Sequence, residues 1–446
     1  MTLKLLLAFL CGVRAQQGPP PLLLVSFDGF RADYLQRFPM VNLKLLYGQG
    51  VLVEELTNAF ITKTFPNHYT LVTGLYTESH GIVANYMYDP VSHTYFHAGA
   101  KNEQWWWNEA EPIWVTALDS GYKTAGGMWP GSDLAIRNRT PTYFLPYNSA
   151  VTFRQRVENV TNWILGDGKE DGVKFATLYW EEPDRSGHFY GPDNTTAMGK
   201  VLKEVDDNIG VLVSELKRTG LWGHVNVLIV SDHGMTQVST ERLIRLDDCI
   251  SPDTYTVVDL TPVAAIFPHE DPESIVNQLN KCHSHMKAYL KKDIPDRLHY
   301  SNNVRIQPVI VVADEGWTIV QNGNNINRLG DHGYDNALPS MHPFFAATGP
   351  SFRQGYKIKR LHSVDIYPLM CHLLSVPPQP NNGSMTQARC LLAGESCWDV
   401  DMTVRLLVGI LLLIAAVAIV FKLVCRRKTS EPLIPKNRVE GDHDFL

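Results

Sequence analysis

The sequence predicts an α/β protein built on a mostly parallel central sheet with helices on both faces. Three runs rich in valine, isoleucine and leucine, beginning at residues 21, 173 and 224, are typical of buried central strands. Between the second and third runs, residues 197–220 repeat apolar side chains at three- and four-residue spacing, which predicts an amphipathic helix. Strands that alternate with helices over this length indicate a parallel sheet covered by helical crossovers.

The two ends of the chain predict a protein that is exported and then anchored. Residues 1–15, MTLKLLLAFLCGVRA, carry a lysine, an apolar stretch and a small last residue, as a cleaved signal peptide does. Residues 403–425 contain the apolar run LLVGILLLIAAVAIVF, which suits a bilayer-spanning helix. The basic residues CRRK at its end place the tail, 426–446, in the cytoplasm. We therefore expect residues 16–402 to form an extracellular domain with its core at 21–375.

Composition and surface motifs agree with an extracellular protein. The net charge of −6 is mild and spread along the chain, so nothing predicts a nucleic-acid partner. Sequons of the form Asn-x-Ser/Thr predict N-glycosylation in this setting. The predicted sites are Asn138, Asn159, Asn194 and Asn382.

The cysteines outside the predicted signal peptide and membrane span predict two disulfides and one free thiol. Cys390 and Cys397 are close enough in sequence to close a small loop, and Cys249 with Cys282 is the natural second pair. Cys371 lies inside the apolar segment YPLMCHLL, so we expect a buried free thiol there.

Each of the three predicted strands is followed by side chains that can bind a metal ion. A fourth segment, LGDHGYDN at 329–336, repeats the Asp-His-Gly trio found at 232–234. Ligands gather beyond the carboxyl ends of parallel strands, so these groups are expected to meet. They are Asp28, Asp184, His188, Asp232, His233 and His332. Mixed nitrogen and oxygen ligands suit zinc, and six are too many for one catalytic ion with an open position, so we expect two zinc ions.

The segment TKTFPNHYT, residues 62–70, offers two hydroxyl groups, those of Thr62 and Thr64. A threonine hydroxyl is a poor nucleophile near neutral pH unless a neighbour lowers its pKa, as a metal ion does. Thr64 is preferred because it directly precedes FPNHY, where Pro66 suits the first turn of a helix. The start of a helix favours both an alkoxide and an incoming phosphate.

Six motifs together resemble the ectonucleotide pyrophosphatase/phosphodiesterases, a family with the alkaline-phosphatase fold. They are SFDGFRADY, TKTFPNHYTLVTGLYTESHGIVAN, MWPGSD, YWEEPDRSGHFYGP, VSDHGM and GDHGYDNALPSMHP, and the resemblance covers residues 21–375. The C-terminal anchor is similar to that of the short, membrane-tethered members. The resemblance implies an alkaline-phosphatase-like sandwich and two zinc sites. The first would be held by Asp28, Asp232, His233 and the Thr64 oxygen, and the second by Asp184, His188 and His332.

The resemblance also implies roles for four substrate-binding side chains. Asn85 is similar to a donor to a non-bridging phosphate oxygen, and Phe65 and Tyr147 resemble the pair that stacks on the nucleobase. Asp133, in MWPGSD, is expected near the edge of the base. His68 and His80 match no ligand position, so we expect packing or hydrogen-bonding roles for them.

The function implied is extracellular hydrolysis of nucleotide phosphodiester or pyrophosphate bonds through a nucleotidyl-threonine, releasing a nucleoside 5′-monophosphate. The expected substrates are dinucleoside polyphosphates such as diadenosine triphosphate, with ATP secondary. NAD and choline-type phosphodiesters are alternative substrates, and an inactive adhesion or receptor ectodomain is an alternative function. A sulfatase is excluded, because the chain has no Cys/Ser-x-Pro-x-Arg nucleophile motif.

Overall fold

The structure is a computed structural model that describes residues 18–98, 103–167, 172–321, 323, 327–397 and 400–428. The predicted signal peptide, 1–15, and residues 429–446 of the predicted tail lie outside the described residues. The chain divides into two units, 1–395 and 396–446, and each is considered by itself.

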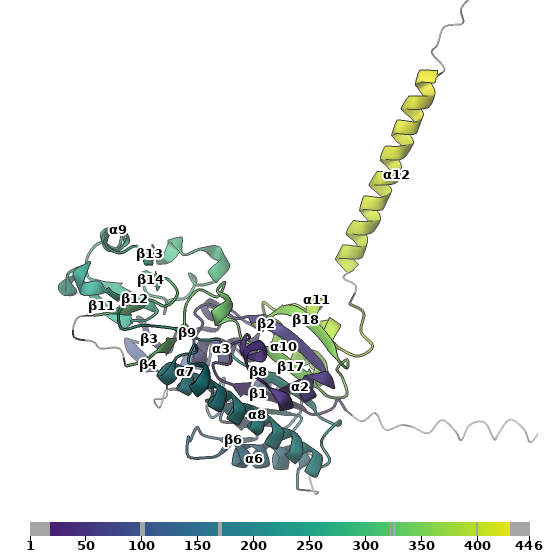
Figure 1. The fold of residues 1–446 in the computed structure, drawn as a ribbon, viewed down its shortest axis with the longest axis horizontal. Helices are drawn as coiled ribbons and strands as arrows, with labels where there is room; N and C mark the ends of the chain where they lie inside the picture. The colour runs from purple at the N-terminus through teal and green to yellow at the C-terminus, as the bar shows by residue number, and fades with distance from the viewer. Residues whose placement is uncertain are drawn as a thin grey trace, which may run out of the picture. The chain divides into compact units, whose positions relative to one another are not determined.

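The first unit is built on a central sheet of eight strands, in the order β18-β2-β17-β8-β1-β7-β5-β6. Neighbouring strands of this sheet, such as β2, β17, β8 and β1, can be followed in Figure 1. Within this sheet β17 runs antiparallel to its neighbours β2 and β8, and the other adjacent pairs are parallel. The prediction of a mostly parallel sheet is therefore confirmed. The strands are β1 (Leu22–Phe27), β2 (Val51–Thr57), β5 (Thr124–Gly127), β6 (Tyr143–Leu145), β7 (Phe175–Trp180), β8 (Asn226–Val230), β17 (Phe345–Thr348) and β18 (Tyr356–His362).

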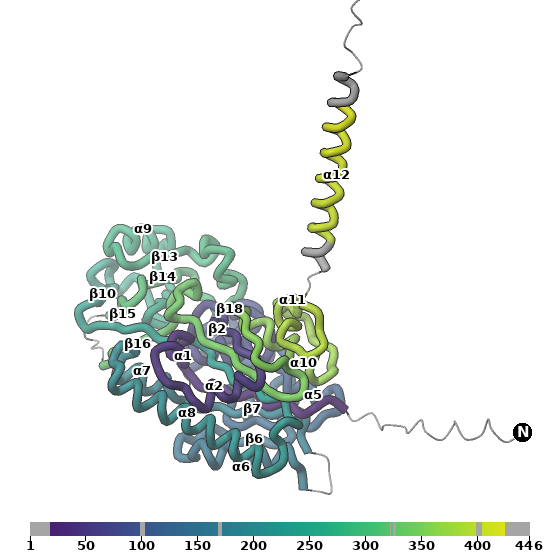
Figure 2. The backbone as a smooth tube through the Cα atoms, turned by 45° about the vertical axis from the view of Figure 1, so that its right-hand side comes forward, coloured from purple at the N-terminus to yellow at the C-terminus, as the bar shows by residue number. Residues whose placement is uncertain are grey.

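The two faces of the sheet are covered by separate groups of helices. Successive side chains of a strand point to opposite faces, so Leu22 and Leu24 of β1 enter one core while Leu23 and Val25 enter the other. The first core contains α3 (Thr64–Thr73), α5 (Ile113–Asp119) and α10 (Ile366–Leu374). The second contains α2 (Val41–Gly48), α6 (Phe153–Leu165) and α8 (Thr195–Arg218); α6 and α8 lie side by side in Figures 1 and 2.

A second, smaller sheet within the first unit was not predicted. Its four strands are antiparallel in the order β11-β12-β14-β13, and helix α9 (Pro272–Cys282) packs against β13. The strands are β11 (Tyr255–Asp259), β12 (Val263–Pro268), β13 (Met286–Leu290) and β14 (Val309–Ala313). This sheet has its own core, which includes Ile266, Leu279 and Val311.

The remaining helices and strands are short, and most of them lie in the connections between the elements of the two sheets. They are α1 (Tyr34–Arg37), α4 (Thr77–His80), β3 (Tyr86–Asp89), β4 (Thr94–His97), α7 (Asp184–Tyr190), β9 (Thr236–Gln237), β10 (Leu243–Arg245), β15 (Thr318–Val320), β16 (Gly330–Asp331) and α11 (Met385–Ala388).

The disulfide between Cys249 and Cys282 is confirmed, and it ties α9 to the segment before β11. Cys371 is a buried free thiol, as expected. The Cys390–Cys397 pair stays a prediction.

The predicted glycosylation sites lie in varied surroundings, and their modification stays a prediction. Asn138 and Asn194 are exposed, Asn194 as the residue that caps α8. Asn382 is exposed as well, and its side-chain oxygen accepts a hydrogen bond from the backbone amide of Tyr76. Asn159 is half-buried on α6, and its amide nitrogen donates to the carbonyl of Gln155.

The second unit contains one long apolar helix, α12 (Val400–Lys428). Its segment Val404–Leu423 has a mean hydropathy of 2.9 and none of it is buried. By length and composition this segment could cross a membrane, and it falls within the predicted span, 403–425.

His80 is a buried packing residue, and we expect it to make the protein sensitive to acid. Its side chain is fully buried, its Nε2 lies 3.0 Å from the Thr70 hydroxyl, and burial lowers its pKa to about 3. In the unfolded chain the His80 imidazole therefore binds a proton below about pH 6.5, whereas in the folded chain it stays neutral. The free energy of unfolding falls as the pH drops below that value. Between pH 7 and 4.5 the free energy of unfolding should fall by up to about 2–3 kcal/mol more in the wild type than in His80→Gln. Urea unfolding at both pH values measures this difference, and equal losses in the two proteins would contradict it.

Candidate active site

The candidate nucleophile, Thr64, is the first residue of α3 and is half-buried. Lys63 before it is extended, so the Thr64 side chain stands at the helix N-terminus, where unpaired amides favour negative charge. Pro66, with no amide hydrogen, fits this first turn without losing a helical hydrogen bond. The Thr64 hydroxyl lies 3.2 Å from Nε2 of His233, which links the nucleophile to the predicted ligands.

Three predicted imidazole ligands are held by the same kind of hydrogen bond. The Nδ1 atoms of His188, His233 and His332 lie 2.8, 2.8 and 2.9 Å from the carbonyl oxygens of Gly330, Gly234 and Thr62. A carbonyl oxygen can only accept, so each Nδ1 carries the proton and each Nε2 keeps its lone pair. This is the state of a metal-binding histidine, with the second nitrogen fixing the ring.

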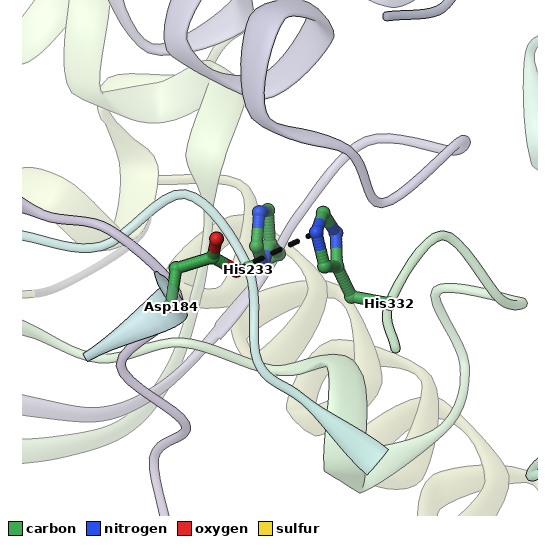
Figure 3. A group of neighbouring side chains, drawn as sticks. All are labelled: Asp184, His233 and His332. Atoms are coloured by element: carbon green, nitrogen blue, oxygen red, sulfur yellow. Dashed lines mark ion pairs between the residues drawn. The ribbon is translucent and has the colours of Figure 1, made fainter. Parts of the chain in front are cut away.

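The free Nε2 atoms face carboxylates, and that of His233 also faces the Thr64 hydroxyl. Nε2 of His233 lies 3.3 Å from Oδ1 of Asp28 and 3.0 Å from Oδ2 of Asp232. The Nε2 atoms of His188 and His332 each lie 3.5 Å from an oxygen of Asp184. Figure 3 shows the side chains of Asp184, His233 and His332 converging, and the rings of His233 and His332 stack with centroids 3.5 Å apart.

The carboxylates of the site retain buried oxygens that the described residues leave without a hydrogen bond. These are Oδ1 of Asp28, Oδ1 of Asp184 and Oδ2 of Asp232. Unpaired buried oxygens facing unprotonated imidazole nitrogens are unfavourable among themselves and suit a cation placed between them. The donor set therefore fits divalent metal ions with mixed nitrogen and oxygen ligands, such as zinc.

The electrostatics of the site agree with this interpretation. Burial and the charges of Asp232 and Asp184 hold the pKa of Asp28 well above its usual range. Burial acts against ionisation of Asp232, but His233 and His68 hold its pKa well below the usual range. Burial, together with His233 and His188, lowers the pKa of His332 far below its usual value. Burial acts against protonation of His233, but the charge of Asp232 and the hydrogen bond to it raise the pKa of His233. Positive charge is therefore favoured beside these crowded carboxylates, and a divalent cation would supply it.

The side chains form two groups by proximity, and one of them includes His68. The groups are Asp184 with His233 and His332, and Asp28 with His68 and Asp232; in each group the ligand atoms lie within 4.8 Å of one another. Both ring nitrogens of His68 already have partners: Nδ1 donates to the Thr64 carbonyl at 2.8 Å, and Nε2 lies 2.9 Å from the Ser26 hydroxyl. His68 therefore positions the first turn of α3, a hydrogen-bonding role as expected. His233 faces the Asp28 and Asp232 pair through Nε2.

Gly29 allows Asp184 to lie next to Asp28. Its φ is +69°, a backbone conformation that favours glycine, and a Cβ atom there would lie 2.7 Å from the Cα of Asp184. Any other residue would push the two carboxylates apart.

The predicted substrate-binding residues differ in how closely their contacts connect them to the nucleophile. The side-chain oxygen of Asn85 accepts a hydrogen bond from the Phe65 amide at 3.0 Å, which leaves its NH₂ group available as a donor. The Phe65 ring packs against Phe96 and Trp107, with centroids 5.8 and 6.0 Å away. Tyr147 is 55% exposed, so part of its side chain is accessible to a base. Asp133 is exposed, and no contact among the described residues connects it to the other three.

A cavity of about 600 Å³ adjoins the site. His188, His332 and Asn85 line it together with Lys63, Tyr86 and Asp259. Lys63 is buried and donates from Nζ to the Thr261 carbonyl at 2.6 Å, so its side chain is held in the wall of this cavity. Sequence reasoning missed Lys63, because an isolated lysine before a helix is normally a solvated surface residue.

Tyr179 is a second residue that sequence reasoning missed. Its hydroxyl donates to Oδ2 of Asp28 at 2.6 Å, and its ring lies 6.2 Å from that of Tyr147. The one available signal was its position at the end of a strand that leads directly to Asp184.

Several known proteins are similar to this chain in sequence. Bis(5′-adenosyl)-triphosphatase ENPP4 of Homo sapiens is 54% identical over 397 residues, covering 89% of this chain and 87% of the human protein. The Xenopus laevis protein of the same name is 51% identical over 427 residues, covering 96% of this chain and 94% of the frog protein. Human ectonucleotide pyrophosphatase/phosphodiesterase family member 5 is 47% identical over 374 residues, 83% of this chain and 78% of its own.

Solved structures of the same kind superpose on this chain. Human ectonucleotide pyrophosphatase/phosphodiesterase 5 matches with a TM-score of 0.81 and 46% identity, covering 84% of this chain and 100% of its own. An inactive threonine-to-alanine variant of the murine protein, in complex with AMP, matches with the same TM-score, 45% identity and the same coverage. The family model for type I phosphodiesterase/nucleotide pyrophosphatase matches residues 22–335. On this sequence and structural similarity, the chain belongs to the type I phosphodiesterase/nucleotide pyrophosphatase family.

Proposed function

We propose that this chain hydrolyses dinucleoside polyphosphates, cleaving diadenosine triphosphate to AMP and ADP with two divalent metal ions, zinc by the nature of the ligands. The names of the ENPP4 relatives support the substrate, and the AMP complex of the family member 5 variant supports an adenine nucleotide. The observation that carries the proposal is the Thr64 hydroxyl, at a helix N-terminus, 3.2 Å from a histidine that faces two buried carboxylates.

The metal ions would be held by two sets of side chains. One set is Asp28, Asp232 and His233 with the Thr64 oxygen, and the other is Asp184, His188 and His332. When bound, the ions would act as Lewis acids that stabilise negative charge on phosphoryl oxygens and lower the pKa of the Thr64 hydroxyl.

Thr64 is the nucleophile in this proposal. Its hydroxyl proton is lost to solvent, its oxygen forms a bond to the phosphorus of one adenylyl group while the bond from that phosphorus to the bridging oxygen breaks, and ADP leaves with the electron pair of that bond. Water then cleaves the adenylyl-threonine ester, which restores the hydroxyl and releases AMP, so one water molecule is consumed for each substrate. The N-terminus of α3 favours the negative charge that builds up on the phosphoryl group during both steps.

The substrate is oriented by side chains next to the nucleophile. Asn85 would donate from its NH₂ group to a non-bridging phosphate oxygen, since its oxygen is already used by the Phe65 amide. Phe65 and the exposed part of the Tyr147 side chain would hold the adenine, and stacking of this kind contributes about 1–3 kcal/mol.

The apolar helix α12 supports an anchored protein whose catalytic unit is outside the cell. In this proposal residues 404–423 span the membrane, and the basic end of α12 lies on the cytoplasmic side. The disulfide between Cys249 and Cys282 agrees with an oxidising, extracellular compartment.

A substrate panel tests the function. The purified protein should hydrolyse diadenosine triphosphate and a nitrophenyl ester of a nucleoside 5′-monophosphate, and act more slowly on ATP. We expect low activity on NAD, nitrophenyl phosphate and a phosphocholine ester. Chromatography of the products should show equal amounts of AMP and ADP from diadenosine triphosphate. Hydrolysis of NAD in preference to diadenosine triphosphate would refute the proposed substrate, and inactivity on every compound would favour an adhesion or receptor role.

A further inference from the structure

Tyr179 contacts one of the predicted metal ligands and has no place in the chemistry described so far. It lies near the end of β7, in register with Ser26 of β1, two residues before Asp28. Its side chain is 8% exposed, and its hydroxyl donates to Oδ2 of Asp28 at 2.6 Å. Such a short, buried hydrogen bond to a carboxylate is among the stronger neutral-donor contacts in proteins.

The two oxygens of Asp28 are used differently as a result. Oδ2 is occupied by the Tyr179 hydroxyl, whereas Oδ1 accepts no hydrogen bond from the described residues and lies 3.3 Å from Nε2 of His233. A carboxylate without this phenol could rotate and present either oxygen, or both, to the site. The hydrogen bond therefore selects Oδ1 as the oxygen that faces His233.

The Tyr179 ring is itself held in place by the residues around the nucleophile. It meets the ring of His68 edge to face, with centroids 5.2 Å apart, and His68 donates to the Thr64 carbonyl. The Trp129 ring packs against His68 from 4.9 Å. The phenol thus has a fixed direction, and the same packing that orients the first turn of α3 orients the hydroxyl.

We propose that Tyr179 is a positioning residue that restricts Asp28 to one metal-facing oxygen and so sets the metal affinity of the Asp28, Asp232 and His233 group. The inference rests on the metal centre of the proposed function. Partners that orient a metal ligand typically change metal affinity by about 10–100-fold. The Asp184, His188 and His332 group has no contact with the Tyr179 hydroxyl in the described structure, so its affinity should not change.

The experiment compares Tyr179→Phe with Tyr69→Phe in the full chain, purified in detergent. Tyr69 is a matched control, since it is also buried and its hydroxyl donates at 2.6 Å, but to the Trp107 carbonyl. Each protein is freed of metal, checked for folding by circular dichroism, and titrated with zinc against a competing chelator. The wild type should bind two zinc ions, and Tyr179→Phe should bind one of them about 10–100-fold more weakly. Tyr69→Phe should match the wild type.

The outcomes separate this inference from the function on which it rests. Excess zinc should restore most of the turnover of Tyr179→Phe, because every ligand is still present. A folded Tyr179→Phe protein that binds both ions as tightly as the wild type would overturn the inference while leaving the metal centre intact. An equal loss in Tyr69→Phe would overturn it too, by showing a general effect of removing a buried hydroxyl. A wild type that binds fewer than two ions would refute the proposed centre itself.

Discussion

Replacing Thr64 with alanine is expected to lower turnover on diadenosine triphosphate by about 10³-fold or more, because the variant has no oxygen to form the covalent intermediate. The Thr64 side chain is half-buried and no described residue other than His233 forms a hydrogen bond with its hydroxyl, so the fold should be unaffected. Steady-state kinetics measures the loss of turnover, and calorimetry measures AMP binding separately. AMP should still bind, since the substrate-orienting side chains remain.

Two further variants control the Thr64 result. Thr73→Ala lies at the other end of α3 and removes a buried hydroxyl that donates to the Tyr69 carbonyl at 2.7 Å, so it should cost some stability and no catalysis. Thr64→Ser keeps a hydroxyl and should retain measurable turnover. If Thr64→Ala kept more than a tenth of the wild-type rate, Thr64 would not be the nucleophile, and Thr62 would have to be reconsidered.

Removing the metal ions is expected to have an effect of similar size. Treatment with a strong chelator should abolish hydrolysis of diadenosine triphosphate, and added zinc should restore it, because the three carboxylates and three imidazoles of the site converge in an arrangement that fits cations. His332→Ala should show the same loss without chelator, by about 10²–10³-fold, together with a zinc content reduced from two ions per chain towards one. Elemental analysis of the purified proteins gives the metal content.

His342→Ala provides the matched control for His332→Ala. Its imidazole is equally buried, but Nε2 pairs with the Asn336 carbonyl at 3.0 Å rather than facing a carboxylate of the site. This variant should keep two zinc ions per chain. Full activity after exhaustive chelation, or two zinc ions retained in His332→Ala, would contradict the ligand assignment.

Much of the fold and site could be predicted because the determining signals are local in the sequence. The three buried strands are continuous apolar runs, and Asp28, Asp184 and Asp232 follow them within a few residues. Parallel strands in one sheet must end at the same edge, so their following residues meet whatever the loops do. The preference for Thr64 over Thr62 also rests on neighbouring residues, because it depends on where helix α3 begins.

The insertion with the second sheet could not be predicted from these signals. Strands β11–β14 are short, and the apolar runs of β12 (VAAIF) and β14 (VIVVA) resemble those of the central sheet, so nothing local in the sequence assigns them to a separate antiparallel sheet with its own core. The expected Cys249–Cys282 disulfide indicates only that these two residues are adjacent, and it does not indicate the sheet that lies between and after them.

The sequence alone determined the class of fold and indicated the candidate ligands and the candidate nucleophile, because strand pattern, residue type and helix start are properties of neighbouring residues. The tertiary structure alone decided which nitrogen of each histidine is free, since that depends on carbonyls such as those of Gly330 and Thr62, 142 and 270 residues away from their partners. It also decided which oxygen of Asp28 faces the site, because the Tyr179 hydroxyl that selects it comes from a strand 151 residues later. Metal ligands are chosen by residue type, but their orientation is set by contacts that only folding brings together.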